Sequence, residues 1–434
     1  MPDANLRVLV LGGYGFIGAA AARALADAGA EVCIAGRDAA AAVRVMPGWT
    51  FQNLDLLHMQ SPESWKKILQ SRTLVVNCAG ALQDRAPGGL EQIHHRAIAA
   101  LAQACAASGT GLVQISAAGA DPAASTAFLR SKAAGDAAVR AAGGRHWILR
   151  PGLVIGREAF GGTLLLRMLA AVPLVQPMAL GGAQVQCAGL EDVARAVVLA
   201  ASGDLPPGTY DLVEETPQDL SSVVRRTRHW RGFAPARLTL PVPFWALRAA
   251  AWAADALGRL GWRPPLRSIA LKVLEAGVTG DPAAFAAAAG PLPPLDQVLA
   301  RLPSGRAARL EARMALLMPL CVAGLCLFWL ASGLIGLWQL REAASVLTGI
   351  GWGAGPALAS VIFWALADIA LGAGILWRPW AARACLAMAT VTAVYLLAAT
   401  WLTPGLWADP LGPLVKVGPA LLLALVSHQL LQER

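Results

Sequence analysis

The first 230 residues alternate short apolar runs with longer, alanine-rich stretches that have the spacing of helices. The apolar runs, each of strand length, cover residues 6–11, 31–35, 50–54, 74–78, 112–116 and 146–150. The helical patterns between them include residues 17–28, 93–107 and 123–142. Because apolar strands that alternate with helices form βαβ units, this part is predicted to be an α/β domain, a Rossmann-type doubly wound parallel sheet with helices on both faces.

Beyond residue 310 the pattern changes to four long apolar stretches. They cover residues 314–340, 356–377, 384–402 and 411–431, and the only ionic side chains or histidines inside them are Asp368, Lys416 and His428. A helix needs roughly 20 apolar residues to cross a bilayer, and these stretches have that length. Because the links between them are short, the prediction is an all-α bundle of four transmembrane helices.

The segment between these two parts is basic and aromatic. Residues 238–277 place Trp245, Trp252 and Trp262 among arginines at helical spacing. This pattern is typical of helices that lie against the cytosolic leaflet, and a soluble helical substrate lobe is the alternative that stays open. The predicted domains are therefore 1–230, which binds a nucleotide, 231–310, which is a lobe or interfacial region with a connector, and 311–434, which spans the membrane.

Basic residues are distributed unevenly around the four apolar stretches. Four arginines precede the first stretch, and Arg378 and Arg383 join the second to the third. The first link holds one arginine beside a glutamate, and the third link holds no lysine or arginine. The positive-inside rule then predicts a multi-pass protein of the inner (cytoplasmic) membrane, with the Rossmann domain and the C-terminus in the cytosol.

Composition agrees with a membrane protein and excludes several other classes. Of the 434 residues, 56% are hydrophobic and only 15% are charged, whereas a soluble chain carries about 25% charged residues. The net charge of +9 would suit nucleic acid, an anionic membrane or a phosphorylated ligand, but no lysine- and arginine-rich run with interleaved aromatics favours nucleic acid. The seven cysteines are scattered without a C-x-x-C pair, so we expect neither a metal site nor a disulfide framework.

The turn after the first predicted strand has the spacing of a dinucleotide-binding loop. Its expected cofactor-binding residues are Gly12, Gly13, Gly15, Phe16, Ile17 and Gly18. Glycines allow the backbone to turn tightly and approach a pyrophosphate, which then meets the N-terminus of the following helix. Arg37 stands at the end of the second strand, where NAD-binding proteins usually carry an acid, so NADP(H) is the preferred cofactor and NAD(H) the alternative.

Several motifs in order resemble the extended or atypical short-chain dehydrogenases/reductases, and in pattern the NADPH-binding accessory subunits of respiratory complex I. They include the glycine turn, Asp55 in Asn-Leu-Asp-Leu, and Asn-Cys-Ala-Gly at 77–80. The resemblance implies that Asp55 contacts the adenine, that Ala79 and Gly80 line the cofactor channel, and that Lys132 holds the nicotinamide ribose. The membrane half is similar to DoxX-like four-helix proteins.

The chain departs from that family at its catalytic motif. The family uses Y-x-x-x-K with a serine: the tyrosine transfers a proton, the lysine lowers the tyrosine pKa, and the serine polarises the substrate oxygen. Here Ser116 and Lys132 are present, but Phe128 occupies the tyrosine position and has no proton to transfer. Ser116 and Lys132 are thus the candidate catalytic residues of an incomplete site.

Two functions follow from these residues. The first is a non-catalytic, NADP(H)-binding or redox-sensing module of a membrane complex, which Phe128 favours. The alternative is an NADPH-dependent oxidoreductase that acts on a quinone or lipid in the bilayer. A nucleotide-sugar epimerase would need the same missing tyrosine. Asp368 and Lys416 could form an ion pair between the second and fourth stretches, or Lys416 could extend to the interface.

Overall fold

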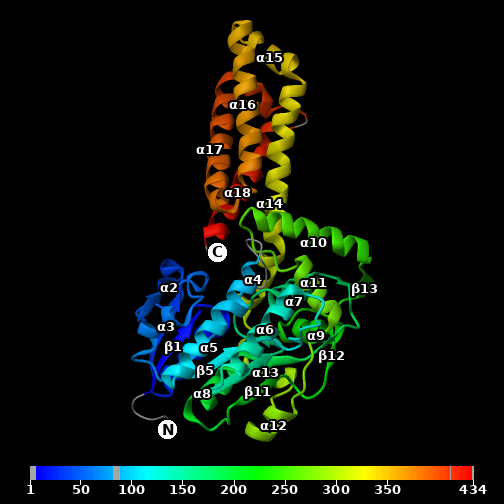
Figure 1. Cartoon of the computed structure of the whole chain (residues 1–434). Coiled ribbons are helices and arrows are strands. Elements are labelled where there is room, and N and C mark those ends of the chain that lie inside the picture. The colour runs from blue at the N-terminus through cyan, green and yellow to red at the C-terminus, as the bar shows by residue number, and fades with distance from the viewer. Residues whose placement is uncertain (1–5, 82–87, 411, 433–434) are drawn as a thin grey trace. The chain divides into compact units, whose positions relative to one another are not determined.

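The computed structural model describes residues 6–81, 88–410 and 412–432 (Figure 1). The chain forms two compact units. The first comprises Met1–Trp252 and Pro265–Leu310, and the second comprises Ala253–Pro264 and Glu311–Arg434. Each unit has its own hydrophobic core and is described by itself below.

A seven-stranded sheet forms the centre of the first unit, and every neighbouring pair of strands in it is parallel. In order across the sheet the strands are β11 (Gly208–Leu212), β6 (His146–Pro151), β5 (Gly111–Ile115), β4 (Leu74–Asn77), β1 (Arg7–Leu11), β2 (Glu31–Gly36) and β3 (Phe51–Asn53). The order reverses between β1 and β4, which is where ligands bind in open sheets of this kind. The predicted doubly wound parallel sheet is confirmed.

Helices cover both faces of this sheet because its central strands carry apolar side chains on both faces. Val8 and Val10 of β1 point into one core, and Leu9 and Leu11 point into the other. The helices and helical turns of this part are α1 (Phe16–Asp27), α2 (Ala39–Val45), η1 (Leu56–His58), α3 (Pro62–Leu69), α4 (Gly89–Glu91), η2 (Gln92–Arg96), α5 (Ala97–Ser108), α6 (Ala127–Ala141) and α8 (Leu190–Ser202). Helices α1 and α8 contribute to the first core, and α3 and α5 to the second.

The rest of the first unit builds a smaller lobe with a third apolar core. Its strands are β7 (Leu153–Ile155), β8 (Val175–Met178), β9 (Gln184–Val185), β10 (Cys187–Gly189), β12 (Gln218–Asp219) and β13 (Leu238–Pro241). The helices that accompany them are α7 (Gly162–Ala171), α9 (Leu220–Trp230), α11 (Ser268–Ala276), α12 (Ala283–Ala289) and α13 (Leu295–Arg301). Helix α10 (Phe244–Arg259) begins in this unit, where Trp245 and Trp252 are each 74% exposed.

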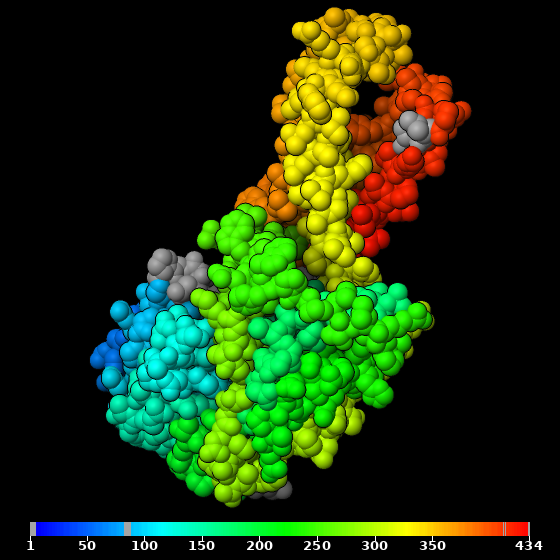
Figure 2. Space-filling view, turned by 90° about the vertical axis from the view of Figure 1, so that its right-hand side faces the viewer, coloured from blue at the N-terminus to red at the C-terminus, as the bar shows by residue number. Residues whose placement is uncertain are grey.

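The second unit contains four helices that are long and apolar enough to cross a membrane. They are α14 (Arg306–Trp338), α16 (Ala354–Gly374), α17 (Arg378–Leu402) and α18 (Pro413–Gln432), with α15 (Leu340–Gly349) and η3 (Pro404–Trp407) in the links. Leucines along α14 are exposed, and Figure 2 shows this helix (yellow) on the surface along its length, as expected for side chains that meet lipid. The four predicted transmembrane helices are confirmed.

Small residues allow these helices to approach closely. A Cβ added at Gly333 of α14 would overlap the carbonyl oxygen of Ala365 in α16, and one added at Gly372 of α16 would lie 2.9 Å from the backbone nitrogen of Leu330. Small residues at such contacts are typical of helix pairs in membranes, where dispersion contacts replace the hydrophobic effect. These glycines fix the spacing between α14 and α16.

The intramembrane charges are not paired with each other. Asp368 is 5% exposed and accepts hydrogen bonds from Ser332 Oγ, at 2.7 Å, and from Tyr395 Oη, at 2.9 Å. Lys416 is exposed and makes no ion pair with Asp368. The ion pair between the second and fourth spans, one of the two alternatives predicted from the sequence, is therefore not formed.

Candidate functional site

The turn between β1 and α1 has a backbone that only glycine tolerates. Gly12 has a φ of +69°, and a Cβ there would lie 2.9 Å from the Cα of Ala79. A Cβ at Gly18 would overlap the carbonyl oxygen of Gly12. Helix α1 starts at Phe16 and its N-cap residue, Gly15, has no side chain to cap it, so the first N–H groups and the positive dipole end are left for an anionic ligand.

The edge of the site beside β2 is arranged around Tyr14. Its hydroxyl accepts a hydrogen bond from the backbone N–H of Asp38 at 3.1 Å, and its ring lies where a Cβ on Gly36 would be. Arg37, between those two residues, is exposed. Asp55 follows β3 and accepts a hydrogen bond from the backbone N–H of Leu57 at 3.1 Å.

The end of β4 is held in place by a buried amide pair. Asn77 is fully buried, and its Nδ2 donates to Gln114 Oε1 on β5 at 2.8 Å. Its Oδ1 accepts from the N–H of Ala79 at 3.1 Å, which sets the direction of the chain as it leaves the strand. Ala79 is half-buried and Gly80 is exposed, just beyond the carboxyl end of β4, which pairs with β1.

A histidine that the sequence analysis did not single out holds the next residue. His94 is 1% exposed and lies on the π-helical turn η2. This turn packs closely on α6 because residue 135 is a glycine, and a Cβ there would overlap the His94 carbonyl oxygen. The His94 Nε2 accepts from the Ala81 N–H at 3.0 Å, so Nδ1 carries the proton and donates to Ser131 Oγ at 2.9 Å. The available signal in the sequence was the histidine pair at 94 and 95 before an alanine-rich helical pattern.

The protonation state of this histidine is set by its surroundings. Burial, and then the nearby positive charge of Lys132, lower the pKa of His94 to about 2. The ring is therefore neutral at ordinary pH and serves as a bridge between the Ala81 backbone and α6, through Ser131.

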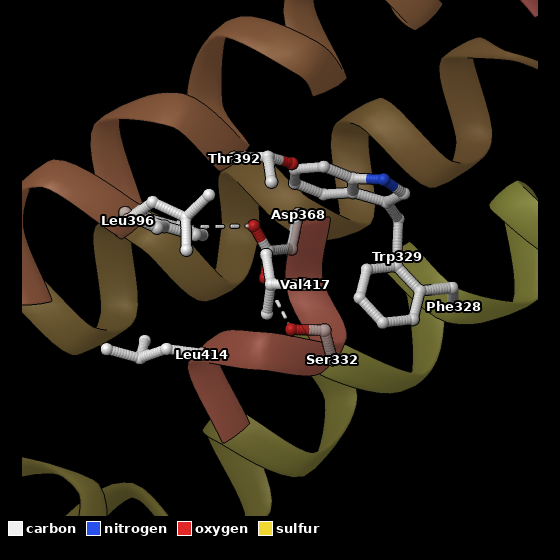
Figure 3. A pocket seen from close by; sticks show the side chains of 9 residues that line it. Phe328, Trp329, Ser332, Asp368, Thr392, Leu396, Leu414 and Val417 are labelled. Atoms are coloured by element: carbon white, nitrogen blue, oxygen red, sulfur yellow. Dashed lines mark hydrogen bonds between the residues drawn. The ribbon is translucent and has the colours of Figure 1, made fainter. Parts of the chain in front are cut away.

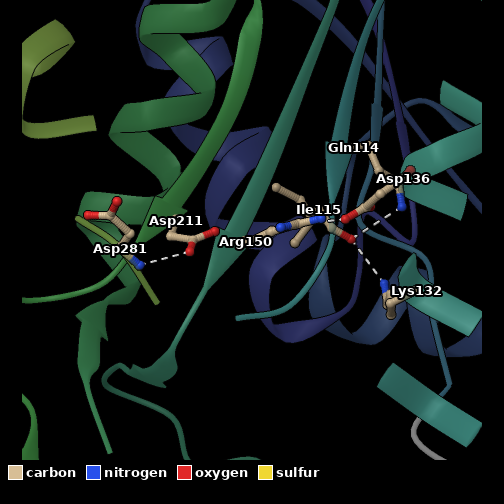
Figure 4. A network of polar contacts seen from close by, with 7 residues as sticks. All are labelled: Gln114, Ile115, Lys132, Asp136, Arg150, Asp211 and Asp281. Atoms are coloured by element: carbon tan, nitrogen blue, oxygen red, sulfur yellow. Dashed lines mark hydrogen bonds and ion pairs between the residues drawn. The ribbon is translucent and has the colours of Figure 1, made fainter. Parts of the chain in front are cut away.

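Lys132 lies at one end of a polar network and reaches the carbonyl oxygen of Ile115 (Figure 4). Its Nζ donates to the carbonyl oxygen of Ile115 at 3.0 Å, and a Cβ added at Gly80 would be 3.4 Å from that nitrogen. Burial lowers the pKa of Lys132, and the negative charge of Asp136 partly opposes this. Asp136 is fully buried and accepts from Arg150 Nε at 2.8 Å, while burial is the main cause that raises its pKa.

The two candidate catalytic residues meet at the end of β5. Ser116 directly follows Ile115, whose carbonyl holds Lys132, and its side chain is buried. The Ser116 hydroxyl has no hydrogen bond of ordinary geometry within the described residues, although it lies near enough to Asp136 to lower the pKa of that carboxyl. The structure thus brings Ser116, Lys132 and Gly80 to one place, at the carboxyl ends of β4 and β5.

Phe128 lies on α6, one helical turn before Lys132. Its half-buried ring meets the edge of the His94 ring, with 5.7 Å between centroids. The three tyrosines, all within the described residues, have their hydroxyls elsewhere: that of Tyr14 is beside Asp38, that of Tyr210 donates to Pro206, and that of Tyr395 is in the second unit. No phenol therefore replaces the missing one.

Comparison with known proteins agrees with this geometry. Residues 8–212 match the NAD dependent epimerase/dehydratase family, and residues 326–425 match the DoxX-like family. The ceramide reductase of Caulobacter vibrioides (strain NA1000 / CB15N) is 26% identical over 246 residues, which are 56% of this chain and 75% of that protein.

Two solved structures have the same fold at low identity. The Bordetella bronchiseptica enzyme WbmH, in complex with NAD+, has a TM-score of 0.52 at 16% identity and covers 68% of this chain and 97% of its own. The Citrobacter sp. triphenylmethane reductase, complexed with NADP(H), has a TM-score of 0.52 at 16% identity and covers 69% of this chain and 100% of its own. The chain therefore joins an NAD(P)-binding Rossmann domain, of which residues 8–212 match the epimerase/dehydratase family, to four helices that are long and apolar enough to cross a membrane, of which residues 326–425 match the DoxX-like family.

Proposed function

We propose that this protein is an NADPH-dependent reductase that converts a carbonyl group of a membrane lipid to a hydroxyl group. The relative named for reducing ceramide supports a lipid substrate, as does the fusion to membrane-spanning helices. The missing tyrosine had favoured a non-catalytic module, and the relative favours the oxidoreductase instead. Exposed Trp245 and Trp252 on α10 offer an apolar surface through which the first unit would meet lipid.

The residues present fit a dinucleotide phosphate. The cradle in which Gly12 and Gly18 leave no room for a Cβ would admit the pyrophosphate to the N-terminus of α1. Asp55 would contact the adenine and Arg37 the 2′-phosphate, which favours NADPH over NADH. Ala79 and Gly80 would line the channel that leads to the nicotinamide, and Lys132 would hold its ribose.

NADPH, when bound, supplies the hydride that reduces the carbonyl carbon. The carbonyl oxygen then needs a proton, and we assign this to the Lys132 ammonium because burial lowers the pKa of that lysine and makes it a stronger acid than an exposed lysine. Ser116 would orient the same oxygen with its hydroxyl. The observation that carries the proposal is the meeting of Lys132 and Ser116 at the end of β5 without a tyrosine.

Substitution of Lys132 tests the assignment. The full chain in nanodiscs is given NADPH and a long-chain keto-amide lipid, and NADPH oxidation and the hydroxyl product are both measured. Lys132→Met removes the acid while keeping an unbranched side chain, and we expect kcat to fall by about 10²- to 10⁴-fold. Lys67→Met on α3 is the matched control, because Lys67 is exposed and away from the site, and it is expected to leave kcat unchanged.

The pH profile separates a proton donor from a ribose contact. If Lys132 donates the proton, the wild-type kcat falls as the pH rises through the pKa of Lys132, which lies below the ordinary lysine value of 10.5. This alkaline limb is absent from Lys132→Met. Equal kcat values for Lys132→Met and the wild type, or an unchanged limb, would contradict the assignment.

Phe128 is the observation that favours the second candidate function, a nucleotide-binding module without turnover. Under that hypothesis the wild type binds NADPH but reduces no lipid, and Phe128→Tyr gains activity because the new phenol lies one turn before Lys132. Wild-type turnover with lipid would reject the module, and a gain only in Phe128→Tyr would support it.

A further inference from the structure

The membrane unit contains a cavity of about 150 Å³ between its helices (Figure 3). Its lining is apolar except for one cluster of oxygen-bearing side chains. The lining residues used below are Trp329, Ser332, Asp368, Thr392, Tyr395 and Val417. At about 30 Å³ for each water of the liquid, this volume would accommodate a small polar group together with part of an apolar chain.

With Asp368 ionised, the oxygen atoms of this cluster can act only as acceptors toward the cavity. Ser332 and Tyr395 both direct their hydroxyl hydrogens to the Asp368 carboxylate, at 2.7 and 2.9 Å. The Thr392 hydroxyl donates to the carbonyl oxygen of Met388 on its own helix, at 2.7 Å. A carboxylate offers about four lone-pair positions, so two hydrogen bonds leave Asp368 with acceptor capacity, and the hydroxyl oxygens keep theirs.

The Asp368 carboxyl has two hydroxyl partners but no cationic one in the part of the chain that the structure describes. It has no ion pair among the described residues, and Lys416, the ionic residue of α18, is exposed. An ionisable group that is 95% buried within a membrane bundle is costly and normally faces a partner or a cavity that a ligand enters. Here the carboxylate lies directly on the cavity wall.

We propose that the Asp368 cavity binds a membrane lipid through hydroxyl or amide N–H donors on its polar segment. An acceptor-only cluster is complementary to donors, and the apolar lining, with the ring of Trp329, is complementary to the adjoining hydrocarbon. A quinone presents only carbonyl acceptors to this cluster and is disfavoured. Calcium and magnesium ions take about six or more oxygen ligands, whereas the four polar side chains of this cluster carry five oxygen atoms between them.

Binding is tested on the nucleotide-free full chain with two matched lipids. The first is radiolabelled N-octanoyl sphinganine, which carries hydroxyl and amide N–H donors, and the second is its O-acetylated, N-methylated derivative, which carries none. We expect the wild type to bind the first about ten- to a hundredfold more tightly, the usual effect of hydrogen bonds to a charged group. Asp368→Asn is expected to remove most of this preference.

A second variant guards against misfolding of the Asp368 substitution. Val417→Phe places a larger apolar side chain on the cavity wall while leaving Asp368 unchanged, and it is expected to weaken binding at least tenfold. Val415→Phe, on the same helix at a position that is 59% exposed, is the matched control and is expected to bind as the wild type does. Equal binding of the two lipids, or unchanged binding in Val417→Phe, would overturn the proposal.

The remaining arms exclude other occupants. If decylubiquinone displaced the labelled lipid as well as unlabelled N-octanoyl sphinganine does, the preference for hydrogen-bond donors would be overturned. If sodium stabilised the wild type but not Asp368→Asn, and no lipid bound, the cavity would be a cation site instead. This binding is independent of the reduction proposed above. Lys132→Met is expected to bind the lipid as the wild type does. A wild type that binds the lipid through Asp368 but reduces no lipid would contradict only the proposed reductase.

Discussion

The buried histidine makes the stability of the first unit depend on pH in a way that a single substitution removes. His94 is enclosed by the Ala81 backbone, Ser131 and the ring of Phe128. In the unfolded chain a histidine takes up a proton near pH 6.5, whereas in the folded chain burial and Lys132 lower the pKa of His94 to about 2. Below about pH 6.5 the unfolded state therefore binds the extra proton and the folded state does not.

The sign and size of the effect follow from this difference. At pH 7 and above, titration of His94 hardly changes the free energy of unfolding. Below pH 6.5 the free energy of unfolding falls as the pH drops, by up to about 1.4 kcal/mol for each pH unit. Between pH 7 and pH 5 the free energy of unfolding is expected to fall by about 2 kcal/mol on account of this one group. His94→Gln replaces the imidazole with an amide, which can still accept and donate a hydrogen bond but does not titrate, so this part of the pH dependence disappears.

The free energy of unfolding is measured locally, in the first unit alone, because the two units need not unfold together. Hydrogen exchange of amides in residues 97–108 of α5, which continues from η2, is followed in nanodiscs at pH 7 and pH 5 with increasing urea. The control is His95→Gln, because His95 is partly exposed and pairs with Glu91 at the surface. An equal loss of stability in the wild type and His94→Gln, or no loss in the wild type, would refute the reasoning.

Three further predictions concern the cofactor and the membrane. Arg37→Ala is expected to remove a preference for NADPH over NADH of about ten- to a hundredfold, measured as the ratio of the two dissociation constants; equal constants in the wild type would contradict this. Gly18→Ala is expected to abolish nucleotide binding because its Cβ overlaps the Gly12 carbonyl, with thermal unfolding of the apo protein as the folding control. A reporter at the C-terminus is expected to be cytosolic, whereas reporters near Glu342 and Asp409 are expected on the opposite side, and a cytosolic signal at Asp409 would contradict the four-span topology.

The sequence alone was sufficient for the architecture of both halves. Strand and helix periodicities are local, and parallel strands that alternate with helices can bury their apolar faces in few ways. The four apolar stretches were as clear, because a bilayer requires a minimum length and satisfied backbone hydrogen bonds. The glycine spacing from Gly12 to Gly18 also predicted the tight turn between β1 and α1, since that backbone geometry excludes side chains.

Only the tertiary structure identified the partners of the buried polar groups. His94 lies 37 positions before Ser131 in the sequence, and their contact depends on the π-helical turn and on Gly135. The sequence offered Lys416 as a partner for Asp368 by charge, but packing of α14, α16 and α17 gave it Ser332 and Tyr395. Hydrogen bonds between distant residues need orientations accurate to a fraction of an ångström, and those orientations arise only when the helices have packed.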